Sequence, residues 1–286
     1  MSALLTATKV TFAVVTVLGS LAGRPADAQE LEYPLAIATH GSAIYLVDRN
    51  LPGIWKSEGG KLGVFFQGSK SFRTPLNAPR CLAIDSEGRL YVGDSATREV
   101  YRFDPDGQPQ PLTGASIGIP MGIAIDAQGD LLVSDLELPR IWKIALSNGK
   151  KTKVERYADV PEPAGICLDG EGRLWVVSRG TNALLRVDSK GNVETVISGR
   201  AFEFPHSVAV DKEGTAFVCD GYARAVWKIP SGGKPQPQKW VAGDPLVQPV
   251  ALAWQDENLL VVDPRAKSVF RIDREGQIST VDLGTK

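Results

Sequence analysis

The sequence predicts an all-β fold, a six-bladed β-propeller built from four-stranded antiparallel blades. Residues 120–144 show the repeating unit, in which short apolar runs rich in β-branched residues are separated by a glycine-bearing turn and a polar stretch. Runs punctuated in this way are typical of consecutive antiparallel strands rather than of helices. A four-stranded unit repeated at this spacing is typical of a propeller blade. Each copy begins at a proline, 41 to 45 residues after the one before: Pro34, Pro79, Pro120, Pro163, Pro205 and Pro249.

The strands of the unit follow one another in a fixed order. The first strand starts after the proline, as in LAIA, CLAID, GIAID, GICLD, SVAVD and ALAWQ. The second is IYLVD, LYVGD, LLVSD, LWVVS, AFVCD or LLVVD. The third carries a bulky residue followed by a base, as in Trp55-Lys56 and Trp227-Lys228, and the fourth closes the unit, as in KLGVFF, KVERYA, NVETVIS, PQKWVA and QISTVDL. One blade cannot bury both of its faces, so six blades are expected to stack around one axis.

The predicted domain organisation is a signal peptide at residues 1–28 and one propeller at residues 29–286, with blades that begin near residues 34, 79, 120, 163, 205 and 249. Lys9 precedes the apolar run Val10–Leu18, and Ala26 and Ala28 are the small residues that an exporting peptidase reads. The apolar run is short for a bilayer span, which needs about 20 residues. We therefore expect an exported protein, periplasmic or secreted, with no membrane span after cleavage; an uncleaved N-terminal anchor is the alternative.

The amino-acid composition and net charge exclude some classes of function. The chain has 286 residues, 43% hydrophobic and 23% charged, with a net charge of -1, so it predicts an ordinary globular protein, expected to be a monomer. A near-neutral balance argues against electrostatic binding of nucleic acid. The three cysteines are an odd number and lie in or beside predicted strands, which favours buried small hydrophobic side chains over a disulfide or a metal site.

Features that repeat in every blade are most simply explained by the fold. Five blades end their second strand in aspartate, and only Ser178 departs from this pattern. We expect these aspartates to accept hydrogen bonds from backbone amides of the following loop, and the aspartates after the first strands to form turns. The second-strand aspartates are Asp48, Asp94, Asp135, Asp220 and Asp263, and the turn aspartates are Asp85, Asp126, Asp169 and Asp211.

Features that break the repeat are candidates for function. The residue after the proline and the loop after the second strand share one rim of the central channel, here called the channel mouth. His206 is a candidate general base or metal ligand there, or a hydrogen-bonded structural histidine. Arg80 could bind an anion or neutralise the nearby aspartates. The candidate binding set at the mouth is Glu32, Arg80, Ser178, Arg179, His206, Arg224 and Arg265.

The blades resemble the NHL repeat in their pattern P-x-G-[IV]-A-[IV]-D…G-x-L-x-V-x-D…[RI]-[IV]-x-[KR]-[IF], from Pro34 to Leu283. The sequence is distantly similar to the regucalcin/gluconolactonase and peptidyl-hydroxyglycine lyase propellers and to NHL propellers that only bind partners. The lyase resemblance implies three zinc-binding histidines after blade prolines, of which only His206 is present. The gluconolactonase resemblance implies a divalent-cation site, and only Glu32 matches it, because Met121 and Ala164 occupy the other two places.

The sequence therefore predicts an exported NHL-type propeller that binds a protein, a peptide or an anionic saccharide through the channel mouth. Whether it is an enzyme stays open. No catalytic residue, metal ligand or cofactor is predicted, with calcium or another divalent cation as the open alternative. The alternative function is a propeller hydrolase or lyase, such as a gluconolactonase/SMP-like esterase or lactonase, with a non-standard site at Glu32, Arg80, Ser178 and His206.

The sequence leaves two ways in which the ring of blades could close. Each predicted blade is complete within itself, so blades six and one are expected to close the ring by packing. Alternatively, residues 29–33 add an outer strand to the last blade.

Overall fold

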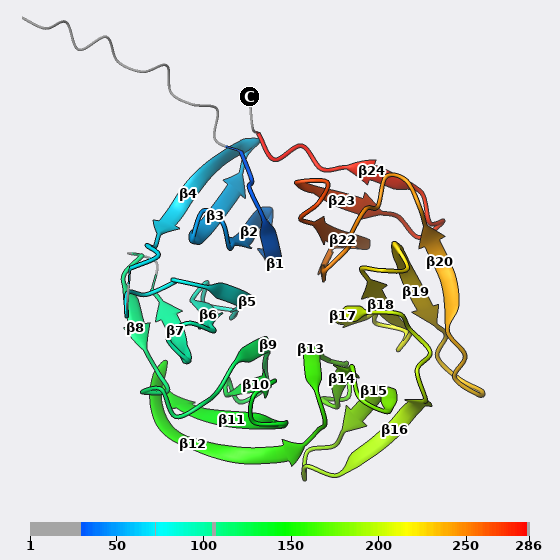
Figure 1. Cartoon of the computed structure of the whole chain (residues 1–286), viewed down its shortest axis with the longest axis horizontal. Helices are drawn as coiled ribbons and strands as arrows, with labels where there is room; N and C mark the ends of the chain where they lie inside the picture. The colour runs from blue at the N-terminus through cyan, green and yellow to red at the C-terminus, as the bar shows by residue number, and fades with distance from the viewer. Residues whose placement is uncertain (1–29, 72, 105–106, 285–286) are drawn as a thin grey trace, which may run out of the picture.

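The computed structural model describes residues 30–71, 73–104 and 107–284, and these residues form six four-stranded antiparallel sheets arranged as a ring (Figure 1). In each sheet the four strands are hydrogen-bonded in the order in which they occur in the chain. The predicted six-bladed β-propeller is confirmed. No helix occurs among the described residues, and so none of a length and hydrophobicity that could span a membrane. The predicted signal peptide lies outside the described residues.

The strand bounds follow the sequence repeat closely. Blades one and two contain β1 (Pro34–His40), β2 (Ala43–Asp48), β3 (Gly53–Glu58), β4 (Lys61–Gln67), β5 (Pro79–Ile84), β6 (Leu90–Asp94), β7 (Glu99–Phe103) and β8 (Pro109–Pro111). Blades three and four contain β9 (Pro120–Ile125), β10 (Leu131–Asp135), β11 (Arg140–Ser147), β12 (Lys150–Asp159), β13 (Pro163–Leu168), β14 (Leu174–Ser178), β15 (Asn182–Val187) and β16 (Val193–Ser198). Blades five and six contain β17 (Pro205–Val210), β18 (Ala216–Asp220), β19 (Ala225–Ile229), β20 (Gln238–Ala242), β21 (Ala251–Gln255), β22 (Asn258–Asp263), β23 (Ser268–Ile272) and β24 (Ile278–Thr280).

The core lies between neighbouring blades. Second strands such as β2 and β6 are buried at every position, whereas outer strands such as β16 and β20 are largely exposed. Between blades one and two, Val47 and Ile54 pack against Leu82 and Val92, and each of the other blade junctions has a comparable apolar cluster. Blade stacking therefore buries the apolar faces that a single blade would leave exposed.

The ring closes through both ends of the described chain. Leu31 and Leu283 pack with Trp55 of blade one and Val262 of blade six in one cluster. The Ser57 hydroxyl donates a hydrogen bond of 2.9 Å to the Leu283 carbonyl oxygen. Packing between blades six and one, as expected, closes the ring. Residues 30–33 form no strand, so the idea that they extend the last blade is wrong for the described part of that segment.

The cysteines are structural, as predicted. All three are free thiols; Cys81 and Cys219 are buried and Cys167 is partly buried. Burial raises the pKa of the Cys81 and Cys219 thiols to about 12 and raises that of Cys167 as well. Thiols with raised pKa values are poor nucleophiles and poor metal ligands at neutral pH.

Candidate functional site

A β-bulge after the blade proline places the next side chain at the channel in blades one, two, three and five. In blades one to five the proline pairs with the last residue of the second strand, and the register then shifts past the next residue. Bulges of this kind redirect a side chain out of the regular pleat. The residue after the proline is Arg80 in blade two, Met121 in blade three and His206 in blade five. All three line a channel cavity of about 320 Å³ that the first strands of the six blades enclose.

Buried aspartates hold the loops of the mouth in place. All five second-strand aspartates are fully buried. The Asp135 carboxylate accepts backbone N–H bonds from Gly118 and Ile119, at 2.6 and 2.9 Å, and from Glu137 and Leu138, both at 3.0 Å. The predicted bonds to the following loop are confirmed, and each carboxylate also accepts from the segment before its own blade proline. These carboxylates are therefore occupied by the backbone.

Ser178 performs this role with a hydroxyl in blade four. It is 3% exposed, its Oγ donates to the Pro161 carbonyl oxygen at 2.6 Å, and it accepts from the Gly180 N–H at 3.1 Å. Both hydrogen-bonding functions of the hydroxyl are thus used within the loop. Blade four thus lacks the second-strand carboxylate of the other five blades, although the charge of Glu162 still acts on the adjacent Arg179.

Arg179 is the centre of the cluster at the mouth. Its Nε donates to the Pro205 carbonyl oxygen at 3.1 Å, and one terminal nitrogen lies 3.1 Å from His206 Nδ1. Its guanidinium carbon lies 4.2 Å from the centre of the Phe204 ring, a cation–π contact. Burial, and then the charge of Arg80, lowers the pKa of Arg179. Among the described residues no carboxylate forms an ion pair with it.

Arg80 is a second half-buried cation with few partners. One terminal nitrogen lies 4.0 Å from Met121 Sδ, and its Nε is buried with no hydrogen-bond partner in the described structure. Burial, followed by the charge of Arg49, lowers the pKa of Arg80. No described aspartate pairs with Arg80, so it does not neutralise the aspartate ring. Arg80 and Arg179 therefore place two positive charges at the mouth that form no ion pair with a described carboxylate.

His206 is neutral in this environment. Burial, and then the charge of Arg179, lowers its pKa to about 3. A guanidinium can only donate, so Nδ1 is the acceptor and the ring proton is on Nε2, which is buried without a partner. The ring also packs edge-on against Phe204 at 5.0 Å. Nδ1, the nitrogen that could accept a proton, is thus occupied by Arg179. His206 therefore supports the position of Arg179 and does not act as a free base.

The depressed pKa of His206 gives an expected pH dependence. Between its unfolded pKa near 6.5 and its folded pKa near 3, the unfolded chain binds a proton that the folded protein excludes, so stability falls as the pH falls. The slope from this group is at most about 1.4 kcal/mol per pH unit. We expect His206→Gln to lose less unfolding free energy than the wild type between pH 7 and pH 5, measured by denaturant titration. Equal losses would contradict the assignment.

The remaining candidates lie apart from this cluster. Arg224 donates through Nε to the Leu246 carbonyl oxygen at 2.9 Å and pairs with Asp244. Arg265 donates through Nε to Gln248 Oε1 at 3.1 Å. Glu32 is exposed, and its described contact is a backbone N–H bond to Asp48. The structure thus brings together Arg80, Arg179 and His206 from the predicted set.

Two aromatic residues of the site were missed by the sequence interpretation. Phe204 precedes the blade-five proline, and Tyr222 lies in the loop after β18. Their rings stack at 4.7 Å with 18° between the planes, and Tyr222 is 65% exposed. Their position could have identified them. Both lie in the loops of blade five beside His206, and no other blade has an aromatic residue at both of these positions.

The residues at the mouth do not fit a divalent cation. A hard cation needs several oxygen ligands. The places that the gluconolactonase resemblance implies hold the thioether of Met121 and the methyl group of Ala164, and the Arg80 guanidinium lies against Met121. Within residues 30–71, 73–104 and 107–284, no group of three or more His, Cys, Asp or Glu side chains is placed to hold a metal ion.

Fold and site together define a six-bladed propeller with a cationic, aromatic-flanked channel mouth. Residues 24–209 match the SMP-30/Gluconolactonase/LRE-like region family. The chain belongs to this family.

Individual relatives are distant. The chain is 28% identical over 195 residues to peptidyl-glycine alpha-amidating monooxygenase B of Xenopus laevis, covering 59% of this chain and 22% of that protein. It is 39% identical over 60 residues to human NHL-repeat-containing protein 4, covering 21% of this chain and 49% of that protein. The chain thus spans about a fifth to a half of the length of these relatives. A chain of the solved nidogen/laminin complex has a TM-score of 0.69 at 18% identity, covering 83% of this chain and 92% of that one, which shows the shared fold alone.

Proposed function

We propose that this protein is an exported binding propeller whose channel mouth holds a carboxylate-bearing ligand. The observation that carries the proposal is the pair Arg80 and Arg179: two half-buried guanidinium groups, each with a lowered pKa and neither paired with a described carboxylate. A ligand carboxylate would relieve their repulsion and accept charge-assisted, bidentate hydrogen bonds. The buried Arg80 Nε–H is a donor that such a ligand could satisfy after a small side-chain movement.

The aromatic residues beside the arginines extend the ligand surface. The solvent-exposed ring of Tyr222 stacks on the ring of Phe204. Phe204 also makes the cation–π contact with Arg179. Tyr and Arg, with Trp, are enriched among the residues that contribute most of the binding energy at protein interfaces. Acidic proteins or peptides and anionic saccharides both carry the required carboxylates. A neighbour in fold that was solved in a nidogen/laminin complex supports a protein partner by analogy.

Calorimetric titration of two probes, tetraglutamate and tetragalacturonate, tests this proposal. They have the same number of side carboxylates on a peptide and on a saccharide backbone. We expect at least one of them to bind, with an affinity that falls as salt is added, because screening weakens the charge–charge attraction. Binding of neither probe would overturn the carboxylate proposal.

Family membership favours one alternative, a hydrolase or lactonase that acts at the same mouth. That function requires a base or a Lewis acid, and the described basic nitrogen of His206 is engaged by Arg179. Turnover of gluconolactone or an aryl ester that is lost in His206→Gln, together with absence of carboxylate binding, would establish the alternative.

Export gives a separate expected result. Lys9, the apolar run Val10–Leu18 and the small residues at positions 26 and 28 support cleavage after Ala28. We expect the protein recovered outside the cytoplasm of an expressing bacterium to begin at Gln29, as measured by intact mass. A mass that includes residues 1–28 would contradict cleavage.

A further inference from the structure

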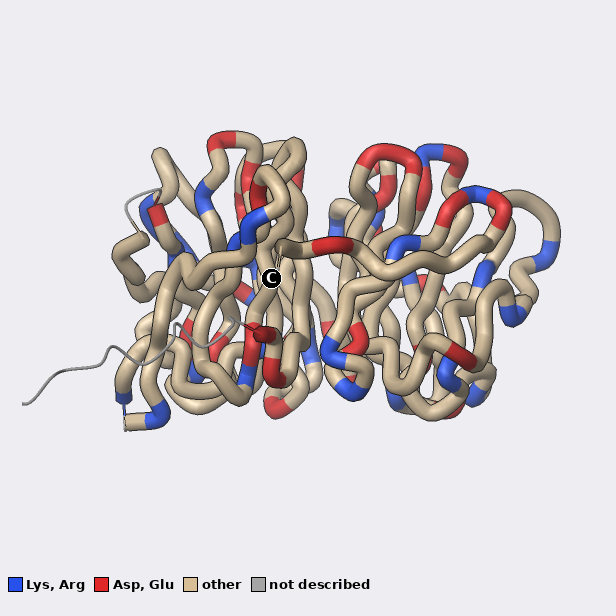
Figure 2. Tube along the Cα trace, turned by 90° about the horizontal axis from the view of Figure 1, so that it is seen from above, with Lys and Arg blue, Asp and Glu red and all other residues tan. Residues whose placement is uncertain are grey.

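We propose that a second ligand site, for a neutral sugar ring, lies between blades five and six on the face opposite the channel mouth. A cavity of about 580 Å³ opens there among the turns that contain Asp211, Asp256 and Asp273. These turns connect β17 to β18, β21 to β22 and β23 to β24, and so lie at the other ends of the strands from the mouth. Figure 2 shows charged residues gathered in the loops at both rims of the ring.

Aromatic side chains form the floor and two walls of this cavity. Phe217 is 3% exposed and lies at the bottom. Trp240 of blade five and Trp254 of blade six lie on either side, with ring centres 4.9 and 5.4 Å from that of Phe217. Both indoles are partly exposed. Pockets with aromatic walls and a few placed polar groups are typical of small-molecule sites.

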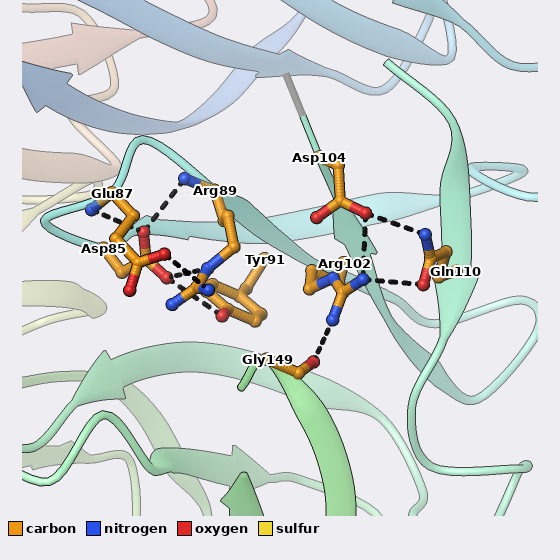
Figure 3. Close-up of polar contacts among 8 residues, drawn as sticks. All are labelled: Asp85, Glu87, Arg89, Tyr91, Arg102, Asp104, Gln110 and Gly149. Carbon is orange, nitrogen blue, oxygen red and sulfur yellow. Dashed lines mark hydrogen bonds and ion pairs between the residues drawn. The ribbon is translucent and has the colours of Figure 1, made fainter. Parts of the chain in front are cut away.

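Blade five lacks the side-chain donors that bond to the corresponding turn aspartate in two other blades. In blade two, Arg89 Nε donates to Asp85 Oδ2 at 2.7 Å and the Tyr91 hydroxyl donates to it at 3.0 Å (Figure 3). Blade four repeats this with Arg173 and Trp175 on Asp169.

In blade five the corresponding residues are Thr215 and Phe217. Asp211 Oδ1 accepts the Glu213 and Thr215 N–H groups, while Oδ2 accepts no hydrogen bond from any described residue. The blade-five turn therefore keeps its backbone geometry but loses its side-chain donors. The result is a cavity-lining carboxylate with one oxygen that has no described donor, where blades two and four have an arginine.

Lys228 supplies a donor in the same cavity. In blade three the corresponding Lys143 pairs with Asp126 at 2.8 Å and Asp130 at 3.1 Å. Lys228 forms no ion pair or hydrogen bond with any described residue, and its ammonium lies 5.9 Å from the ring centres of both Phe217 and Trp240. The cavity thus offers one free carboxylate oxygen, one free ammonium and the Thr215 hydroxyl beside aromatic faces.

The charges of the residues that line the cavity favour a neutral ligand over an anion or a cation. The lining contains five carboxylates and three cations, and two of those cations, Lys212 and Arg274, already pair with Glu257. An anion would face this acidic rim. A cation would compete with Lys228 for the aromatic rings. A neutral sugar ring avoids both penalties, because its hydroxyls can donate to Asp211 and accept from Lys228 while its polarised C–H groups contact the electron-rich faces of the indoles.

Tryptophan fluorescence of the full mature protein tests the site, titrated with glucose, galactose, cellobiose and diacetylchitobiose, and with glucuronate and choline as charged probes. We expect at least one neutral sugar to change the emission with saturation. Thr215→Arg installs the arginine that blades two and four carry, and we expect it to keep the melting temperature while weakening sugar binding about tenfold or more. Thr152→Arg, the same change at an exposed threonine of β12, should leave binding unchanged.

Three results would overturn the proposal. They are no response to any neutral sugar, a stronger response to glucuronate or choline, and wild-type sugar affinity in Thr215→Arg. Should that variant fail to fold, Lys228→Met removes the donor while keeping an unbranched chain over the rings, and retained affinity there overturns the proposal equally. The site is independent of the channel mouth, so charge reversal of the mouth arginines should not alter sugar binding.

Discussion

Asp135→Ala is expected to lower the free energy of unfolding by about 3–5 kcal/mol, a large fraction of the stability of a typical domain. Asp135 is fully buried, and its carboxylate accepts four backbone N–H bonds and a fifth bond from the Trp142 indole at 2.8 Å. Removing it leaves these donors without an acceptor, in a place where water has little access. The loop after β10 and the segment before β9 both lose their anchor, so the mouth should loosen as well. Denaturant titration measures the change.

A matched control separates this effect from loss of a negative charge. Asp159→Ala removes an exposed carboxylate from the end of β12, where it pairs with Arg156. Exposed ion pairs contribute roughly 0–1 kcal/mol, so this variant should unfold almost as the wild type does. If Asp135→Ala and Asp159→Ala lost similar amounts of stability, the role given to the buried aspartates would be wrong.

The double variant Arg80→Glu, Arg179→Glu is expected to weaken binding of the carboxylate probe about 100-fold or more. Each hydrogen bond to a charged group contributes about 1.5–3 kcal/mol, and both would be replaced by repulsion. We expect some loss of stability, because Glu cannot donate the hydrogen bonds that Arg179 gives to the Pro205 carbonyl oxygen and to His206 Nδ1. The protein should still melt cooperatively, since neither arginine belongs to the apolar clusters between the blades. Calorimetry gives the affinity, and a melting scan reports on the fold.

The control for this variant is Lys153→Glu, Arg156→Glu, which changes the net charge by the same amount on the outer strand β12. We expect it to shift the affinity only through long-range attraction, by a small and salt-sensitive factor. Equal losses in the two double variants would mean that net charge, and not the mouth, determines binding.

The fold could be predicted almost completely from the sequence because its signals are local and repeated. The prolines, the strand alternation and the turn glycines recur six times, so an error in one copy is corrected by the others. The fourth strand of blade two was the weakest case: β8 spans only Pro109–Pro111, and two prolines in three residues hide a strand. The role of Leu283 in ring closure could not be predicted, because its contact with Ser57 joins two segments that are far apart in the chain.

The site was only partly predictable, since it depends on which loops meet. The position after the proline identified Arg80 and His206 correctly as channel residues. The contact of Arg179 with His206 comes from adjacent blades, and no spacing in the sequence predicts it. The same holds for the cavity at Trp240 and Trp254, two residues from different blades whose proximity is visible only once the blades are stacked.

Side-chain NMR of the arginines is the most direct test of carboxylate binding by Arg80 and Arg179. Nε–H resonances of Arg80 and Arg179, assigned by single Arg→Lys variants, are followed while tetraglutamate or tetragalacturonate is added. We expect these two resonances to move together and saturate at the calorimetric affinity, with Arg80 shifted downfield as its unpartnered Nε–H gains an acceptor. Saturable shifts confined to other arginines, such as Arg224 and Arg265, would contradict it.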